Sequence, residues 1–250
     1  MATFSGAAAA AVFTEALNGT TGNVTPGTGS NRYVFGGVAA CRTFGGVPTI
    51  DDCRYGGSGG TQLTKLAESL GSLNFTNGSV AAYGVAGSPE TLTNLFGDWA
   101  DETFGAGVGG AFYEGVDQAG PIDDMTVATG LFGDPTSSEL ATLVVPNCVD
   151  GQVVVAMIGM TSGSVSAAAF TAVAGTTIRA QAAADLVGVA LLEATNVGGG
   201  NTTLHVNVNQ GSANSLTWAI LGGRLIDAGG GSAFNPLTGR GGAAAQPLAA

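Results

Sequence analysis

His205 is the only histidine in the 250-residue chain, so a Ser-His-Asp triad would have to include it. Ser162, Ser164 and Ser215 are the serines that we consider as its partners. His205 lies on the polar side of the alternating stretch 202–209, where a surface or inter-subunit histidine is far commoner than a catalytic one. We therefore predict no catalytic residues and expect that the protein is not an enzyme.

Acidic side chains are the second group whose chemistry we considered, because paired carboxylates can bind Ca²⁺ or hydrolyse glycosides. No twelve-residue calcium-binding loop occurs in the sequence. We predict solvated loop residues and no metal site, with calcium binding and catalysis as the alternatives. The residues concerned are Asp51, Asp52, Asp98, Asp101, Glu102, Asp123 and Asp124.

Residues 105–110 match the G-x-G-x-x-G pattern of dinucleotide-binding loops. That function needs a strand before the motif, a helix after it and an acidic residue about 20 positions further on. Here a Trp-Ala-Asp-Glu segment precedes the motif and a β-type run follows it. With 43 glycines in the chain, a chance match is expected. We predict no cofactor.

The three cysteines, Cys41, Cys53 and Cys148, form no C-x-x-C pair and have one histidine to accompany them, which excludes a zinc site. Cys41 and Cys53 fall at the inner ends of two neighbouring predicted strands. A disulfide between them is one interpretation, and two small buried thiols are the other. The sequence leaves both open.

The composition limits the classes of partner. Glycine and alanine together make up a third of the chain, charged residues make up 10%, and the net charge is −11 with seven basic residues. So few basic residues cannot neutralise a run of phosphates or dock on an anionic membrane, so we predict no nucleic-acid and no membrane partner. A surface so poor in charge suits a protein that is covered by copies of itself or by other proteins.

The secondary-structure elements that carry these candidate residues are predicted to be strands. β-branched and alternating apolar runs recur between clusters of Gly, Asn, Asp and Pro. This rhythm is typical of an all-β sandwich. The predicted strands span residues 32–40, 61–68, 79–85, 142–146, 152–160, 186–194, 202–209 and 216–226.

An internal repeat of roughly 110 to 120 residues organises these strands. Each half has a buried opening strand, a polar strand, an Ala-rich strand, a Thr/Leu alternating strand and a closing strand with glycine. We predict two tandem antiparallel β-sandwich modules, jelly-roll or Ig-like, with extended terminal arms. The predicted boundaries are 1–120 for the first module, 121–140 for a linker, 141–228 for the second module and 229–250 for a Gly/Ala-rich arm.

Two motifs of the first half carry a resemblance: Cys-Arg-Tyr-Gly-Gly followed by Leu-Thr-Lys within 53–65, and Tyr-Glu-Gly-Val-Asp-Gln-Ala-Gly-Pro at 113–121. The second half keeps Asp-Gly-Gln-Val-Val-Val-Ala at 150–156 but reads Leu-Gly-Gly-Arg-Leu-Ile-Asp at 221–227. The chain resembles a module of tailed-bacteriophage virion proteins and some secreted bacterial proteins. The resemblance implies a β-sandwich building block for capsid decoration, tail or fibre, and no catalytic residues.

We therefore expect a non-enzymatic virion structural protein that decorates or stabilises the capsid through self-association, arm contacts and contacts with other virion proteins. The alternatives are a tail or fibre component and a carbohydrate-binding adhesin that recognises surface glycans. An adhesin would place Trp99 and Tyr113 on one exposed face, whereas a structural module would bury them separately. The predicted interface residues are Trp99, Tyr113, Phe234, Pro236 and Leu237.

Overall fold

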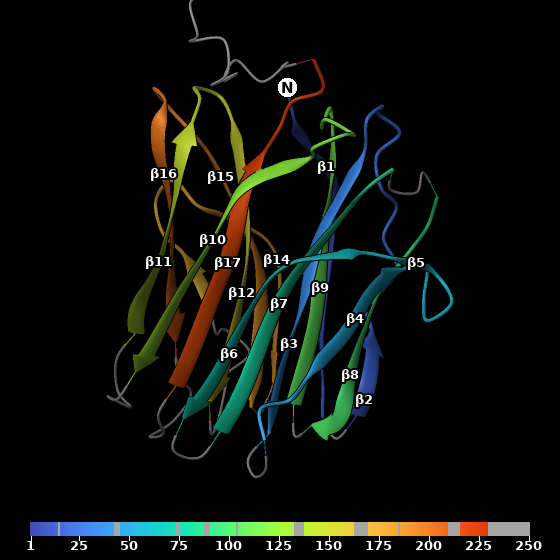
Figure 1. Ribbon diagram of the computed structural model, residues 1–250, viewed down its shortest axis with the longest axis vertical. Helices are drawn as coiled ribbons and strands as arrows, with labels where there is room; N and C mark the ends of the chain where they lie inside the picture. The colour runs from blue at the N-terminus through green and yellow to red at the C-terminus, as the bar shows by residue number, and fades with distance from the viewer. Residues whose placement is uncertain are drawn as a thin grey trace, which may run out of the picture.

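The computed structural model describes residues 1–14, 16–42, 46–73, 76–87, 91–103, 105–132, 138–162, 170–184, 186–209 and 216–229. These residues form seventeen strands and no helix (Figure 1). The first half contains β1 (Thr3–Phe13), β2 (Ala16–Thr20), β3 (Tyr33–Arg42), β4 (Ile50–Tyr55), β5 (Thr61–Gln62), β6 (Thr64–Leu73), β7 (Thr76–Ala86), β8 (Leu95–Thr103) and β9 (Gly105–Glu114). The second contains β10 (Ile122–Phe132), β11 (Ser138–Cys148), β12 (Val153–Ser162), β13 (Phe170–Ala172), β14 (Thr177–Ala184), β15 (Val187–Thr195), β16 (Gly200–Asn209) and β17 (Leu216–Leu225).

The strands form four antiparallel sheets, and no sheet mixes described strands from the two halves. We name them by position: outer sheet 1 (β2-β8-β4-β5), inner sheet 1 (β1-β9-β3-β7-β6), inner sheet 2 (β10-β17-β12-β15-β14) and outer sheet 2 (β11-β16-β13). Three core clusters lie between successive sheets. The result is a stack of four layers, which runs across Figure 1 from β2, β4 and β8 on the right to β11 and β16 on the left.

Burial patterns follow from this layering. β3 and β9 sit in inner sheet 1, which is covered on both faces, and both are buried along nearly their whole length. β16 sits in outer sheet 2, and its side chains alternate between the core and the outer face. The all-β class and the antiparallel pairing are therefore as the sequence predicted.

The connectivity of each half is that of a jelly roll rather than an Ig-like sandwich. In the second half the first strand pairs with the eighth (β10–β17), the second with the seventh (β11–β16) and the third with the sixth (β12–β15). This nested pairing defines the jelly roll. The first half has the same order in its inner sheet, with β1, β9, β3, β7 and β6 in the places of β10, β17, β12, β15 and β14.

Two predictions about local structure are wrong. The segment 121–140, predicted as a linker, contains the 11-residue strand β10 and the start of β11. Its Thr- and Asp-rich sequence misled the prediction because β10 is an edge strand, which has fewer apolar positions to fill. The acidic residues at 51, 52, 98, 101, 102, 123 and 124, predicted in loops, all lie in strands β4, β8 and β10.

The two halves pack through their inner sheets in an approximately twofold arrangement. β3 faces β12 near the centre, β9 and β7 face β15 and β17, and β1 and β6 face β14 and β10. The contacts are reciprocal, since β9 faces β15 while its counterpart β17 faces β7, the counterpart of β15. The contact therefore resembles the isologous interface of a homodimer. The ends of the halves are also joined: Asp117 N donates to Ile226 O (2.7 Å) and Ala228 N donates to Gly115 O (2.8 Å).

Glycines make the close approach of the inner sheets sterically feasible. A Cβ on Gly107 would lie 2.6 Å from Val189 Cγ1, and one on Gly109 would lie 2.6 Å from Leu191 Cδ2. The relation is mutual, since a Cβ on Gly159 would lie 2.5 Å from Val80 Cγ2 of the first half. Distances this short do not occur between real side chains, so each glycine accepts a large side chain from the opposite sheet.

We expect Gly37→Ala to lower the free energy of unfolding by about 1–3 kcal/mol, the usual cost of overpacking. A Cβ on Gly37 would collide with Met157 Sδ of the facing half and with the Ala81 carbonyl of the neighbouring strand. Urea denaturation measures the change. Gly22→Ala is the matched control, because a Cβ there meets nothing within 4 Å. Equal stabilities of the two variants would contradict this account of the interface.

Candidate functional site

His205 lies in β16 with its Nδ1 3.2 Å from Thr142 Oγ1 of β11. Its backbone N donates to Thr176 Oγ1 (2.8 Å). Of the serines considered as its partners, Ser164 and Ser215 lie outside the described residues, and Ser162 is described only as part of the β12 backbone. The described surroundings of His205 hold it on the outer face of outer sheet 2 through hydroxyl groups.

Sequence reasoning missed a G-x-S-x-G match at residues 56–60, the pattern of a nucleophile elbow. An elbow joins a strand to a helix, whereas this segment is the turn between β4 and β5, two antiparallel strands. Ser58 accepts a hydrogen bond from Arg54 Nη1 through its carbonyl (3.1 Å). The turn belongs to outer sheet 1 and His205 to outer sheet 2, so the whole stack separates them. The match has no triad partner there.

The G-x-G-x-x-G motif lies inside β9, between β1 and β3 of inner sheet 1. Its residues are buried, and both neighbouring strands, β1 and β3, run antiparallel to it. No phosphate-binding turn is formed there. The glycines serve inter-sheet packing instead.

Trp99 and Tyr113 are both buried inside the chain, so the prediction that they contact other molecules is wrong. Each is 1% exposed. Trp99 lies in the cluster between outer and inner sheet 1, where its Nε1 donates to Ala16 O (2.6 Å). Tyr113 lies in the cluster between the two inner sheets. Trp99 was misjudged because the acidic Asp98 next to it lies on the solvent side of the strand while Trp99 points into the core. Phe234, Pro236 and Leu237 lie outside the described residues.

The structure decides between the two interpretations of Cys41 and Cys53, since the two residues form no disulfide. Cys41 and Cys53 are free and buried, and they belong to clusters on opposite faces of inner sheet 1. The Cys41 thiol donates a hydrogen bond to Leu186 O of the second half (3.6 Å). Burial raises the pKa of Cys41 to about 12 and raises the pKa of Cys53 further, so both stay protonated at neutral pH. They act as small packing residues, the second of the two interpretations.

Carboxylates gather on the outer face of outer sheet 1. Asp98 is opposite Asp52 in the register of β4 and β8, and a β-bulge adds Asp51 beside them. Arg54 pairs with Asp52. The pKa of Asp98 is raised by partial burial and then by the negative charge of Asp51, with a smaller contribution from Asp52. This group is under mutual repulsion at neutral pH.

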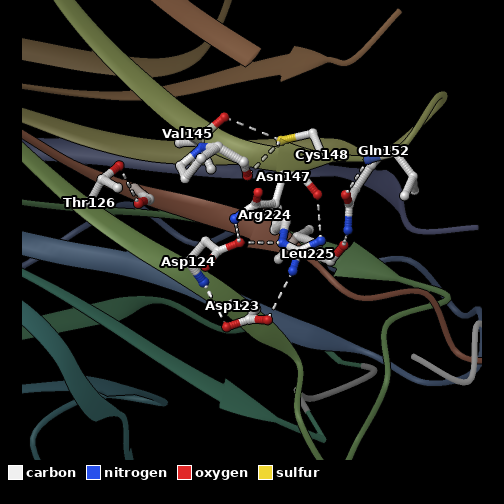
Figure 2. Close-up of polar contacts among 12 residues, drawn as sticks. Asp123, Asp124, Thr126, Val145, Asn147, Cys148, Gln152, Arg224 and Leu225 are labelled. Atoms are coloured by element: carbon white, nitrogen blue, oxygen red, sulfur yellow. Dashed lines mark hydrogen bonds and ion pairs between the residues drawn. The ribbon is translucent and has the colours of Figure 1, made fainter. Parts of the chain in front are cut away.

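A second polar group joins three segments of the second half at one end of β17 (Figure 2). Arg224 Nη1 donates to Asn147 O (2.8 Å), Nη2 donates to Asp123 Oδ2 (3.0 Å), and Nε lies 2.9 Å from Asp124 Oδ2. Asn147 Nδ2 also donates to Asp124 Oδ2 (3.3 Å). Asp124 and Asn147 both have positive φ, 50° and 57°, and lie at breaks in the strand register. Arg224 therefore connects two bulged strands through hydrogen bonds from Nη1 and Nη2 and through the ion pair with Asp124.

The third polar group connects the two halves. Arg179 donates to Glu193 in a two-point contact, Nε to Oε2 (2.9 Å) and Nη2 to Oε1. The Arg179 guanidinium lies 4.2 Å from the centre of the Phe4 ring, and Phe4 packs edge-on to Tyr113. Burial, followed by the nearby Glu193 carboxylate to which its hydroxyl is hydrogen-bonded, raises the pKa of Tyr113. An ion pair of the second half thus holds two aromatic rings of the first.

Sequence reasoning did not single out Arg179, Glu193 or Arg224. The sequence signal that could have identified them is that each is an isolated charge in an apolar run. The run 187–195 contains one charged residue, and so does the run 216–225, in a chain with seven basic residues. A lone charge in an apolar strand needs a partner, and charges of opposite sign occur at few other places.

None of these groups forms a recognisable reaction centre. Among the described residues, no three or more His, Cys, Asp or Glu side chains are arranged to hold a metal ion. The described part of the chain also contains no helix long and apolar enough to cross a membrane. Comparison of the chain with protein-family models and with curated proteins finds no match.

Arg179→Leu should lower the free energy of unfolding by about 3 kcal/mol, because it leaves the buried Glu193 carboxylate without its partner. Urea denaturation is the measurement. The double variant Arg179→Leu/Glu193→Leu is the control and should recover most of the loss, since it removes both charges. A single variant as stable as the original protein would show that the pair does not hold the halves together.

Asp98→Asn should stabilise the protein at about pH 7 by less than about 1 kcal/mol, the scale of exposed charge interactions. A raised pKa means that the folded state binds the proton more tightly than the unfolded state. The original protein therefore gains stability as the pH falls towards the ordinary aspartate pKa of about 3.9, and the variant lacks this gain. Asn18→Asp, directly opposite Asp98, should have the reverse effect at neutral pH. Urea denaturation at about pH 7 and at about pH 3.9 is the measurement. If the free energy of unfolding of Asp98→Asn changed with pH as that of the original protein does, the raised pKa of Asp98 would be contradicted.

Proposed function

We propose that this protein is a non-enzymatic structural component of a bacteriophage particle that decorates or stabilises the capsid surface by associating with its own copies and with other virion proteins. The observation that carries the proposal is the face-to-face packing of two jelly rolls into one four-layer body. Jelly rolls are recurrent building blocks of viral capsids, although lectins also use them. Three cores stacked between four layers give a stiff block suited to a lattice.

The motif that carries the resemblance to virion modules has an architectural place in this body. Tyr113 packs between the halves, Glu114 accepts a hydrogen bond from Gly29 N (3.0 Å), and Gly115 adopts a φ of 71°. Val116 then forms a bridge to Asp227 at the end of the second half. Four successive residues thus close one half and attach it to the other, which supports a structural use of the motif.

The runner-up functions are a tail or fibre component and a glycan-binding adhesin. An adhesin needs exposed aromatic rings for stacking on sugars, but Trp99 and Tyr113 are buried in separate clusters. No aromatic side chain among the described residues reaches the exposure of the exposed aliphatic ones. The geometry therefore favours the structural function.

The test has two parts. Light scattering over a concentration series should show association beyond the monomer. Immunogold labelling of purified phage particles from the bacterium that carries the gene should decorate the capsid in a regular array. Labelling confined to the tail would support the tail or fibre alternative. A protein that is absent from the particles and binds a glycan array would overturn the proposal.

A further inference from the structure

The outer face of outer sheet 2 has no described charged side chain. Outward positions of β11 and β16 hold Leu140, Thr142 and Val144, opposite Asn207, His205 and Thr203 respectively. The one acidic residue of these strands, Glu139, is opposite the buried Val208 and so belongs to the inner side. Leu140 is 48% exposed and Val144 is 45% exposed. A sheet surface of hydroxyls, amides and aliphatic groups is thus open to solvent.

Outer sheet 1, in the equivalent place at the other end of the stack, provides an internal comparison. Its strands β4 and β8 carry five acidic residues and one arginine. Asp98 and Arg54 are partly exposed on the outward side, because the intervening Cys53 and Trp99 point into the core. Asp52 points the same way but is covered, with 6% of its surface exposed. Charges of this kind keep a sheet face solvated and block its pairing with another sheet. Outer sheet 2 lacks that protection.

The net charge of −11 restricts where two copies can meet. Carboxylates facing one another across a contact repel and are costly to desolvate, so self-association favours a surface without them. Outer sheet 2 is such a surface, and it also offers aliphatic side chains for burial. We propose that two copies of this chain associate face to face through their outer sheets 2, with Leu140 and Val144 at the centre of the contact. The inference deepens the proposed function by naming the surface through which copies associate.

The dimensions of the sheet set the strength of this contact. Strands of 11, 10 and three residues, spaced about 5 Å apart, cover roughly 400 Å² per copy. The pair would bury about 800 Å², which is below the usual size of a specific interface. The dimer is therefore weak in solution, with a Kd in the micromolar range or above, and gains strength where a particle holds many copies in register.

Sedimentation equilibrium of the purified protein between about 10 µM and about 1 mM tests the proposal, a range chosen for weak interfaces. The original protein should pass from monomer to dimer. Leu140→Asp and Val144→Asp each place a carboxylate on both faces and should weaken association at least tenfold. Val127→Asp is the matched control, since Val127 is 47% exposed but lies on β10, outside outer sheet 2. It should leave the dimer intact. Urea denaturation of each variant confirms that it is folded.

A complementary pair gives a positive readout that misfolding cannot mimic. Leu140→Lys mixed with Leu140→Asp should restore association that neither variant shows alone. Association that survives Val144→Asp and Leu140→Asp would overturn the proposed surface while leaving the virion function in place. A protein that stays monomeric over the whole range would also overturn it, and the proposed function would then be decided by the particle labelling.

Discussion

The close approach of the two inner sheets is the constraint on which the rest of the structure depends. Gly107 and Gly109 of β9 accept Val189 and Leu191 of β15, and Gly159 of β12 accepts Val80 of β7. Side chains at these glycines would push the halves apart and open the central cluster, which draws residues from both. Since the inner sheets are also covered by the outer ones, their central strands β3, β9 and β15 are buried along nearly their whole length. The high glycine and alanine content and the scarcity of charge both follow from that burial.

Scarcity of charge makes each remaining ion pair more consequential. Arg179 and Glu193 form a two-point contact beside Phe4 and Tyr113. The ion pair therefore holds the two halves together in the polar part of the interface, as the glycines let them pack closely in the apolar part. Arg224 does the same within the second half, where β10 and β11 bulge next to Asp124 and Asn147. In both places a guanidinium supplies several fixed donors at once, which a lysine could not. These two arginines thus stabilise contacts between strands.

Sequence patterns predicted the all-β fold class and many of the strands, because both depend on local sequence signals. The alternation at 202–209 and the apolar run at 152–160 became β16 and β12 almost as predicted. What could not be predicted depends on which faces are covered. Trp99 has acidic neighbours in sequence, yet strand alternation turns it inward towards Ala16. Cys41 and Cys53 end neighbouring predicted strands, yet they face opposite sides of one sheet. The ion-pair partners of Arg179 and Arg224 could not be predicted either. Strand register brings each pair together, and no local sequence motif determines the register.

The approximate twofold relation of the halves makes the difference between the two outer sheets informative. If the halves had only to fold and pack together, equivalent outer faces would face the same solvent and tolerate the same residues. Instead Asp52, Arg54 and Asp98 occupy one face, whereas Thr142, Val144 and His205 occupy the other. Two halves with one topology have therefore acquired chemically different ends, one suited to water and one suited to contact. The molecule therefore has two different ends. A component of an assembly needs such asymmetry if one end is to contact a neighbour while the other remains solvated.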